Sequence, residues 1–122
     1  MPRNMSFMLT TPQIRNHTKD VTRRLNWLFV KSGDILNAVE KGMGLKKGEK
    51  VVRICQIRVV STRLERLNEI TKEDCIREGF PQVEPREFVE MFCKHNKCEQ
   101  TRTINRIVFE YLEINAKQGG GQ

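Results

Sequence analysis

The sequence feature that most constrains the fold is a long run rich in β-branched residues between Lys50 and Leu64, which reads VVRICQIRVVSTRL from Val51 onward. Valine, isoleucine and threonine favour extended backbone because their branched side chains pack well on a pleated surface. Apolar residues occur at both parities of this run, which is typical of a strand in a central or barrel position. We therefore predict one long strand in the middle of a sheet.

Four shorter strands and three helices are predicted around it. Alternating or β-branched patterns predict the strands at 5–9, 19–25, 34–40 and 103–114. The first predicted helix covers 11–16, where a threonine N-cap precedes a proline. The second begins at a sequence that resembles a capping box, 71–74, and ends near 78; the third follows Pro85.

The third predicted helix carries an apolar stripe. Phe88, Met91 and Phe92 occupy positions i, i+3 and i+4 of the sequence REFVEMFCKHN, which follows Pro85. Residues at this spacing share one face of a helix. We predict that this face is buried in the core and does not hold a cofactor.

These elements indicate an α+β protein. The absence of a regular βαβ alternation excludes a Rossmann-type fold and favours a small mixed β-barrel or curled sheet with about three short flanking helices. A chain of 122 residues suits one domain, which we place at 1–115. We expect the glycine-rich residues 116–122 to form a flexible tail and residues 42–50 to form a solvated hairpin loop.

The charge is distributed unevenly. The formal net charge is +7, and residues 1–63 contain 13 of the 22 Lys and Arg residues but only 4 of the 15 Asp and Glu residues. A cluster of cations in a small domain favours phosphate-bearing partners such as RNA, because binding releases condensed counterions. The same excess of charge also serves solubility, and the sequence leaves both interpretations open.

Several classes of protein are disfavoured. No apolar stretch approaches the ~20 residues of a membrane span, and the first residues lack the apolar core of a secretory signal, so we expect a cytoplasmic protein without membrane contact. The four cysteines are then expected to be free thiols. Cys93, His95 and Cys98, with Cys75 as a conceivable fourth ligand, match neither a zinc ribbon nor a zinc finger, so we predict no metal site.

One segment has a spacing that suggests chemistry. Lys19, Thr22 and Arg24 lie in one extended stretch, in which Thr22 and Arg24 share a face and Lys19 reaches Thr22 only if the chain bends at its start. A lysine that is buried near cations such as Arg23 loses its charge and can accept a threonine proton. The same spacing fits a solvated basic strand, and both interpretations stay open.

The chain resembles the ASCH domain family, a branch of the PUA-like superfamily, over nearly its whole length. The family signature GxKxxExR falls on residues 17–24, where Lys19 and Arg24 match while His17 replaces the usual glycine and Thr22 the usual glutamate. The other segments that carry the resemblance are 14–25, the step Gly33-Asp34-Ile35-Leu36, the long strand, 67–80 and the final FEYL.

The threonine is similar to that of the bacterial N4-acetylcytidine amidohydrolases of this family, which carry Lys and Thr three residues apart and an Arg two residues further on. Their third catalytic residue, a glutamate at the end of the helix after the long strand, falls on Glu78. The resemblance implies a hydrolase for N4-acylated cytidine or a related modified nucleoside, without metal or other cofactor. Lys19, Thr22 and Glu78 would be catalytic.

Substrate binding is expected from three further residues. Arg24, with Arg23 beside it, has the forked donors that hold a carboxylate, a base or an acyl oxygen. Trp27 can stack on a nucleobase, although a lone tryptophan is more often part of the core. Two alternative functions remain: a non-catalytic RNA-binding module and a ribonuclease. The sequence leaves the substrate and the oligomeric state open.

Overall fold

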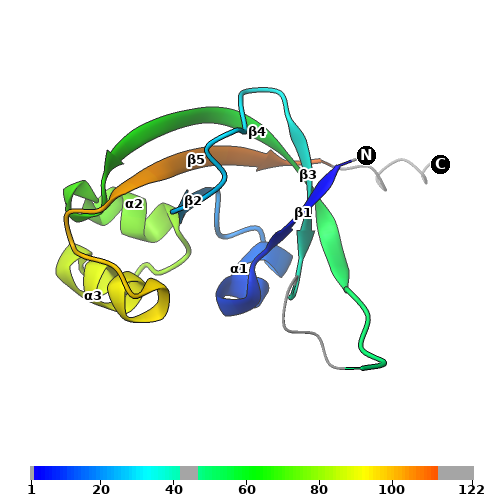
Figure 1. The fold of residues 1–122 in the computed structure, drawn as a ribbon, viewed down its shortest axis with the longest axis horizontal. Helices are drawn as coiled ribbons and strands as arrows, with labels where there is room; N and C mark the ends of the chain where they lie inside the picture. Colours follow the sequence, from blue (N-terminus) through cyan, green and yellow to red (C-terminus); the bar gives the residue numbers. More distant parts are fainter. Residues whose placement is uncertain (1, 42–46, 113–122) are drawn as a thin grey trace.

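The protein forms one curled sheet that partly encloses its helices (Figure 1). The computed structural model describes residues 2–41 and 47–112, and these residues contain five strands in the order β1-β3-β4-β5-β2 and three α-helices. β1 (Arg3–Ser6) runs parallel to β3 (Ile35–Val39), and the other neighbours are antiparallel. The predicted α+β class is confirmed, and of the two predicted architectures, a small barrel or a curled sheet, the structure shows a curled sheet that forms an open half-barrel.

The predicted long strand is the centre of the sheet. β4 (Arg53–Arg66) pairs with β3 over its first half and with β5 (Thr103–Tyr111) over most of its length. The register of β4 shifts against β3 between Ala38 and Val39 and against β5 between Val59 and Ser61. Because an extra residue bends a strand and increases its twist, these irregularities fit the arch that β4 and β5 form over the helices.

The N-terminal strand differs from its prediction. β1 ends at Ser6, and Met8–Thr10 form a 3-10 turn where the sequence predicts a continuing strand. The carbonyl of Phe7 explains the change, because it accepts hydrogen bonds from the backbone of Thr10 and from the hydroxyl of Thr11. Thr11 is accordingly the first residue of α1 (Thr11–Arg15), and Thr10 is the N-cap.

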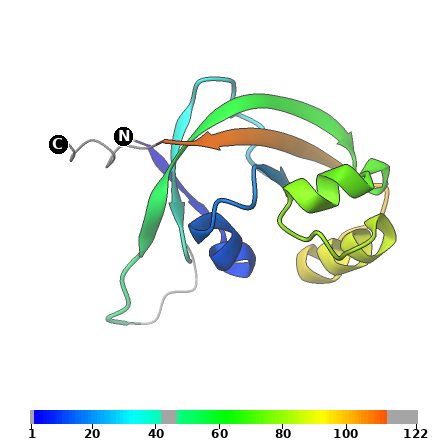
Figure 2. The same cartoon turned by 180° about the vertical axis from the view of Figure 1, so that it is seen from behind.

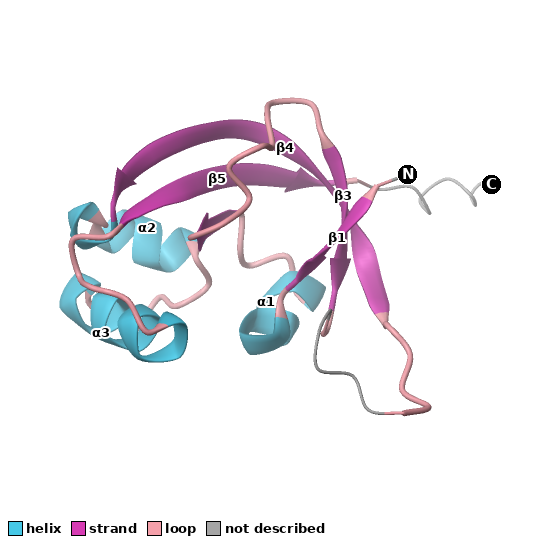
Figure 3. Ribbon diagram, in the orientation of Figure 1, coloured by secondary structure: helices cyan, strands magenta, loops and turns pink. Residues whose placement is uncertain are grey.

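The three helices lie on the concave side of the sheet (Figure 3). α2 (Lys72–Arg77) and α3 (Pro85–Asn96) lie next to each other beneath one end of β4 and β5, as the view from behind also shows (Figure 2). Thr71 caps α2 as predicted, since its side chain accepts a hydrogen bond from the backbone of Asp74. None of the described helices is long and apolar enough to cross a bilayer.

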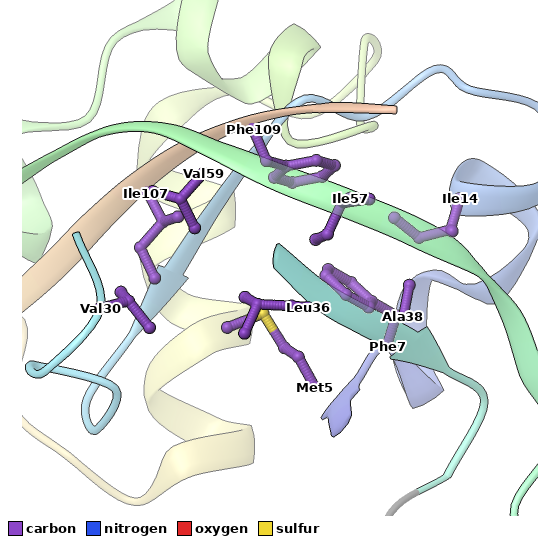
Figure 4. Close-up of a cluster of buried hydrophobic side chains, with 10 residues drawn as sticks. All are labelled: Met5, Phe7, Ile14, Val30, Leu36, Ala38, Ile57, Val59, Ile107 and Phe109. Atoms are coloured by element: carbon purple, nitrogen blue, oxygen red, sulfur yellow. The ribbon is translucent and has the colours of Figure 1, made fainter. Parts of the chain in front are cut away.

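The interior consists of two hydrophobic clusters. The first lies under β3, β4 and β5 and includes Phe7, Ile57 and Phe109 (Figure 4). The second lies between α2, α3 and the end of the sheet and includes Leu67, Phe88 and Ile104. The chain has therefore split its core, which leaves room for polar residues between the two parts.

Of four further sequence predictions, one is corrected by the structure and three lie wholly or partly outside the described residues. Of the stripe on α3, Phe88 is buried and Phe92 half-buried, but Met91 is 37% exposed because this part of the helix faces a cavity. The predicted hairpin loop lies partly, at 42–46, outside the described residues. The predicted tail at 116–122 and the last residues of the predicted strand at 103–114 also lie outside them.

Candidate active site

A cavity of about 330 Å³ lies between the two hydrophobic clusters. Its walls come from the segment after β1, from β2 (Val21–Arg24) and the loop that follows, from the end of α2 and from α3. Phe7 of the first cluster and Phe88 of the second both line it. All six residues that the sequence indicates as site residues are among its lining residues: Lys19, Thr22, Arg23, Arg24, Trp27 and Glu78.

The central feature of the cavity is a buried ion pair. The ammonium Nζ of Lys19 lies 2.5 Å from Oε1 of Glu78 and 3.0 Å from the backbone carbonyl of the same residue. Each of the two residues is only 3% exposed. The two side chains come from positions 59 residues apart in the chain, so only the tertiary fold brings them together.

Backbone contacts fix the two ends of this pair. Glu78 is the C-cap of α2, and Gly79 ends the helix with a φ of +97°, a conformation that glycine adopts without strain. On the other side, the backbone of Asp20 donates to the carbonyl of Arg77, and the two side chains form a two-pronged ion pair. The start of β2 is thereby tied directly to the end of α2.

The bend that the sequence requires before β2 is present. His17 has a φ of 60°, in the left-handed region, and its ring stacks on Tyr111 with 4.0 Å between centroids. The hydroxyl of Tyr111 donates to the carbonyl of Lys19 at 2.5 Å. These contacts turn the chain at 17–19 and place Lys19 in the cavity that Thr22 also lines.

Burial is the main influence on Lys19. Desolvation lowers the pKa of its ammonium, the nearby Glu78 carboxylate raises that pKa, and the positive charges of Arg24 and Arg23 lower it. The net direction is downward from the ordinary value. A lysine in this state releases its proton more readily, and Glu78 is within hydrogen-bonding distance to receive it.

Thr22 and Arg24 form a second unit on the same face of β2. Nε of Arg24 donates to Oγ1 of Thr22 at 3.0 Å, and Nη2 of Arg24 donates to the carbonyl of Ser6 at 2.8 Å. Thr22 is 3% exposed. Its hydroxyl accepts the hydrogen bond from Arg24 but donates its own hydrogen to no acceptor in the described part of the chain. Its hydrogen is therefore free to pass to a base in the cavity.

Arg24 is the cation of the site without an ion-pair partner within 2–41 and 47–112. Its guanidinium lies over the ring of Phe7, 4.8 Å from the ring centroid. Burial lowers the pKa of Arg24 to about 10, although Glu78 opposes this change. The side chain remains charged at neutral pH and presents free N–H donors beside Thr22.

Arg23, which the sequence indicates as a substrate-binding residue beside Arg24, forms a network of ion pairs. It is buried and donates to the carboxylates of Glu78, Asp74 and Glu65 at 3.2, 2.5 and 2.7 Å. Burial lowers the pKa of Arg23, but these three carboxylates outweigh it and raise that pKa overall. Although it lines the cavity, Arg23 mainly supports Glu78 from behind, and its Nε has no partner among the described residues.

Asp74 holds two arginines that lie on neighbouring strands. Arg23 of β2 and Arg106 of β5 are direct cross-strand partners, and Arg106 also donates to both oxygens of Asp74 at 2.6 and 3.0 Å. The hydrogen bonds from Arg106 and Arg23 hold the pKa of Asp74 well below its usual range. The sequence pattern assigned Asp74 only to a helix cap. The signal that could have identified its role is the pairing of two arginines directly across neighbouring strands, because like charges in that position need a carboxylate between them.

Trp27 contributes one wall of the cavity. It has a φ of 67°, its ring lies at 5.3 Å from that of Phe29, and it packs against the first hydrophobic cluster. Asn105, a buried residue of β5, fixes the turn by donating to the Trp27 carbonyl at 2.9 Å. The sequence left open whether Trp27 belongs to the core or to the binding site. In the structure it contacts the core and also lies in the cavity wall.

Sequence reasoning missed the contribution of α3. Met91, His95 and Asn96 line the cavity together with Phe92. The helical stripe identified an apolar face but gave no sign that part of this face borders a cavity. Among the described residues, no group of three or more histidine, cysteine or carboxylate side chains is placed so that it could hold a metal ion.

Comparison with known proteins identifies the fold. No family model matches the chain, and no curated protein matches it. A solved structure described as hypothetical protein PH0355 has 20% sequence identity and a TM-score of 0.64, covering 92% of this chain and 100% of that one. Protein EF3133 from Enterococcus faecalis V583, of family model DUF984, has 13% identity and a TM-score of 0.66, covering 92% and 80%. The likeness shows the fold alone.

Proposed function

We propose that the protein is an amidohydrolase that removes the acyl group from an N4-acylated cytidine or a related modified nucleoside. The observation that carries this proposal is the convergence of Lys19, Thr22 and Glu78 in one cavity, with the first and last in a buried ion pair. The cavity volume, about 330 Å³, lies at the lower end of the range for small-molecule sites and suits a single nucleoside.

Proton sharing between Lys19 and Glu78 supplies the acid and the base of the reaction. In the proposed cycle the Lys19 ammonium, whose pKa burial lowers, passes its proton to the Glu78 carboxylate at 2.5 Å, which gives a neutral amine and a carboxylic acid. The amine takes the hydrogen of the Thr22 hydroxyl as Oγ1 attacks the acyl carbon. The carboxylic acid then protonates the departing N4 of cytidine.

The second half of the cycle restores the site. A water molecule attacks the threonine ester and gives a proton to the Glu78 carboxylate. As the ester bond breaks, Thr22 recovers its hydrogen from the Lys19 ammonium, and the carboxylic acid product leaves. Protons balance over the cycle, and no step of this scheme calls for a metal ion.

Arg24 stabilises the charge that develops during both attacks. Its Nε donates to Thr22 Oγ1 and its Nη2 to the Ser6 carbonyl, so we expect the N–H groups on Nη1 to reach the acyl oxygen of a bound substrate. Charge-assisted donors of this kind stabilise an oxyanion more strongly than a neutral carbonyl. Trp27, Phe88 and Phe92 offer the apolar surfaces against which a cytosine ring can pack.

The resemblance to ASCH proteins supports the same assignment. The signature positions Lys19 and Arg24 both line the cavity, and His17, at the usual glycine of the signature, adopts the positive φ that glycine favours. Thr22 separates this chain from relatives with a glutamate there and agrees with the amidohydrolases.

The decisive experiment replaces Thr22. We expect T22A to lose at least 100-fold in turnover of N4-acetylcytidine, since the attacking oxygen is removed. The measurement is the release of cytidine, monitored by chromatography. The matched control is T62A, which replaces an exposed threonine of β4 and should keep wild-type turnover. Unchanged turnover in T22A would refute the mechanism.

A non-catalytic RNA-binding module is the second candidate, favoured by the net charge of +7 and by Arg24, which has no ion-pair partner in the described part of the chain. It requires single-stranded RNA affinity that falls steeply with salt, together with no turnover of any modified nucleoside. Scission of labelled RNA, with and without EDTA, would instead indicate a ribonuclease. Wild-type protein and K19M assayed side by side separate the three functions.

A further inference from the structure

We propose that Cys93 and Cys98, at the end of α3, form a reversible intramolecular disulfide. The end of this helix is then a site of thiol modification, and the proposal is independent of the amidohydrolase assignment. Both residues lie at the edge of the second hydrophobic cluster.

The helix terminus itself brings the two side chains together. Lys97 adopts the left-handed conformation, with φ 55° and ψ 54°, and the backbone N–H of Cys98 donates to the carbonyl of Cys93 at 3.3 Å. This six-residue turn closes the helix and places its first and sixth side chains in contact. The two Sγ atoms are 4.0 Å apart, so formation of a disulfide of about 2.05 Å requires them to approach by about 2 Å.

The two thiols are accessible as well as adjacent. Cys93 and Cys98 are half-buried, whereas Cys75 is fully buried in the second cluster. Cys55 lies on β4 against the first cluster and shows no sulfur contact among the described residues. Of the four cysteines, this pair combines solvent access with a neighbouring thiol.

The chemistry needs one co-reactant, a low-molecular-weight disulfide. A thiolate of the pair attacks it, its S–S bond breaks, and one small thiol leaves, which gives a mixed disulfide on the protein. The second protein thiolate then attacks the protein sulfur and expels the second small thiol. Two protein thiols are oxidised and one small disulfide is reduced to two thiols, which carry the two protons.

The environment sets the rate of this exchange. Burial raises the pKa of the Cys93 thiol, and the neighbouring Cys98 raises it further. Because only the thiolate reacts, we expect slow exchange at neutral pH and a rate that increases as the pH rises toward 9. His95 and Asn96, which line the cavity, lie inside the loop that the bond would close.

Peptide mapping tests the proposal directly. Trypsin cleaves after Lys94 and Lys97, so Cys93 and Cys98 fall in different peptides, 87–94 and 98–102. The native protein is incubated with oxidised glutathione, its remaining thiols are alkylated at low pH, and the digest is analysed by mass spectrometry without reductant. We expect these two peptides to be joined, and dithiothreitol to separate them.

Two variants complete the experiment. C98S should abolish the joined peptide and leave a glutathione adduct on Cys93, whereas C55S should give the joined peptide in wild-type yield. Joined peptides that involve Cys55 or Cys75, a disulfide between two protein molecules, or two stable glutathione adducts on the wild-type pair would overturn the proposal, as would unmodified thiols after prolonged oxidation at pH 9.

Discussion

At the scale of single residues, the site is a chain of buried ion pairs. Lys19 and Arg23 share the carboxylate of Glu78, and Arg23 continues to Asp74, which also holds Arg106. A buried charge without a partner is costly, and a buried pair with full hydrogen bonding is tolerated. The network therefore keeps these charged side chains in fixed positions between two apolar clusters.

Removing one member of the ion pair should destabilise the protein unequally. E78A leaves both Lys19 and Arg23 short of a carboxylate, and we expect a loss of about 3–5 kcal/mol in the free energy of unfolding. K19M should lose less, because Glu78 keeps Arg23 as its partner. Urea titration measures both, with E110A, which removes the exposed partner of Arg58, as a control that changes stability by at most about 1 kcal/mol. A larger loss in K19M than in E78A would contradict this account.

Asp74 should make stability dependent on acid pH. Its pKa is lowered in the folded state, first by hydrogen bonds from Arg106 and then by those from Arg23, so the folded protein binds its proton more weakly than the unfolded chain. The stabilisation is complete above the unfolded pKa of about 3.9 and is lost as the pH falls through the lower folded value. We expect the deficit of D74N in free energy of unfolding to be large at pH 7 and to shrink below pH 4. Urea titrations of both proteins at several pH values are the measurement, and a constant deficit would contradict the assignment.

At the scale of elements, the site depends on where two short segments stop and start. α2 ends at Glu78 with the turn at Gly79, and the segment before β2 bends at His17. His17 and Gly79, at these two positions, both have positive φ values. A backbone hydrogen bond from Asp20 to Arg77 joins the two segments. The positions of Lys19 and Glu78 are thus set by two chain reversals and one backbone contact.

Gly79 provides a test of this junction. A Cβ atom there would lie 2.6 Å from Cγ of Gln13, whereas Gly33, with the same φ of +97°, has no neighbour within 4 Å. G33A should cost only the backbone strain, about 1–2 kcal/mol, and G79A should cost more and displace Glu78. Urea titration and the turnover assay measure the two effects. Equal stability in the two variants would show that Gln13 moves aside without cost.

At the scale of the whole molecule, the cavity exists because the core is divided. One hydrophobic cluster fills the curled sheet and the other joins α2 and α3 to its end, and the long strands β4 and β5 span both. Phe7 of the first cluster and Phe88 of the second both line the cavity, so we expect a ligand there to contact both clusters. Binding should therefore stabilise the fold as one unit.

Ligand binding should raise the temperature of unfolding. On the proposed function we expect T22A to bind N4-acetylcytidine without converting it, so that the nucleoside at 100 times its Kd adds about 2.7 kcal/mol to the free energy of unfolding. Because the nucleoside is uncharged, we expect the shift in Tm to persist at high salt, unlike an RNA complex. Differential scanning fluorimetry is the measurement, with uridine as the control ligand. A shift that disappears with salt would favour the binding-module function.

Comparison of sequence with structure shows where local patterns suffice. The β-branched run predicted β4 and its central place, and the cap at Thr71 predicted the start of α2. The strand predicted at 5–9 was wrong beyond Ser6, since hydrogen bonds to the Phe7 carbonyl turn the chain there. Met91 was wrongly placed in the core, because the periodicity of a helix gives its apolar face but not what covers that face.

The sequence by itself determined the α+β class, the long central strand and the spacing of Lys19, Thr22 and Arg24, because β-branching, side-chain period and capping act between near neighbours. Only the tertiary structure decided that Glu78 meets Lys19, that Asp74 joins Arg23 to Arg106, and that a cavity divides the core. These contacts join residues 32 to 59 positions apart, and their energies depend on burial, which arises only when the sheet curls over its helices.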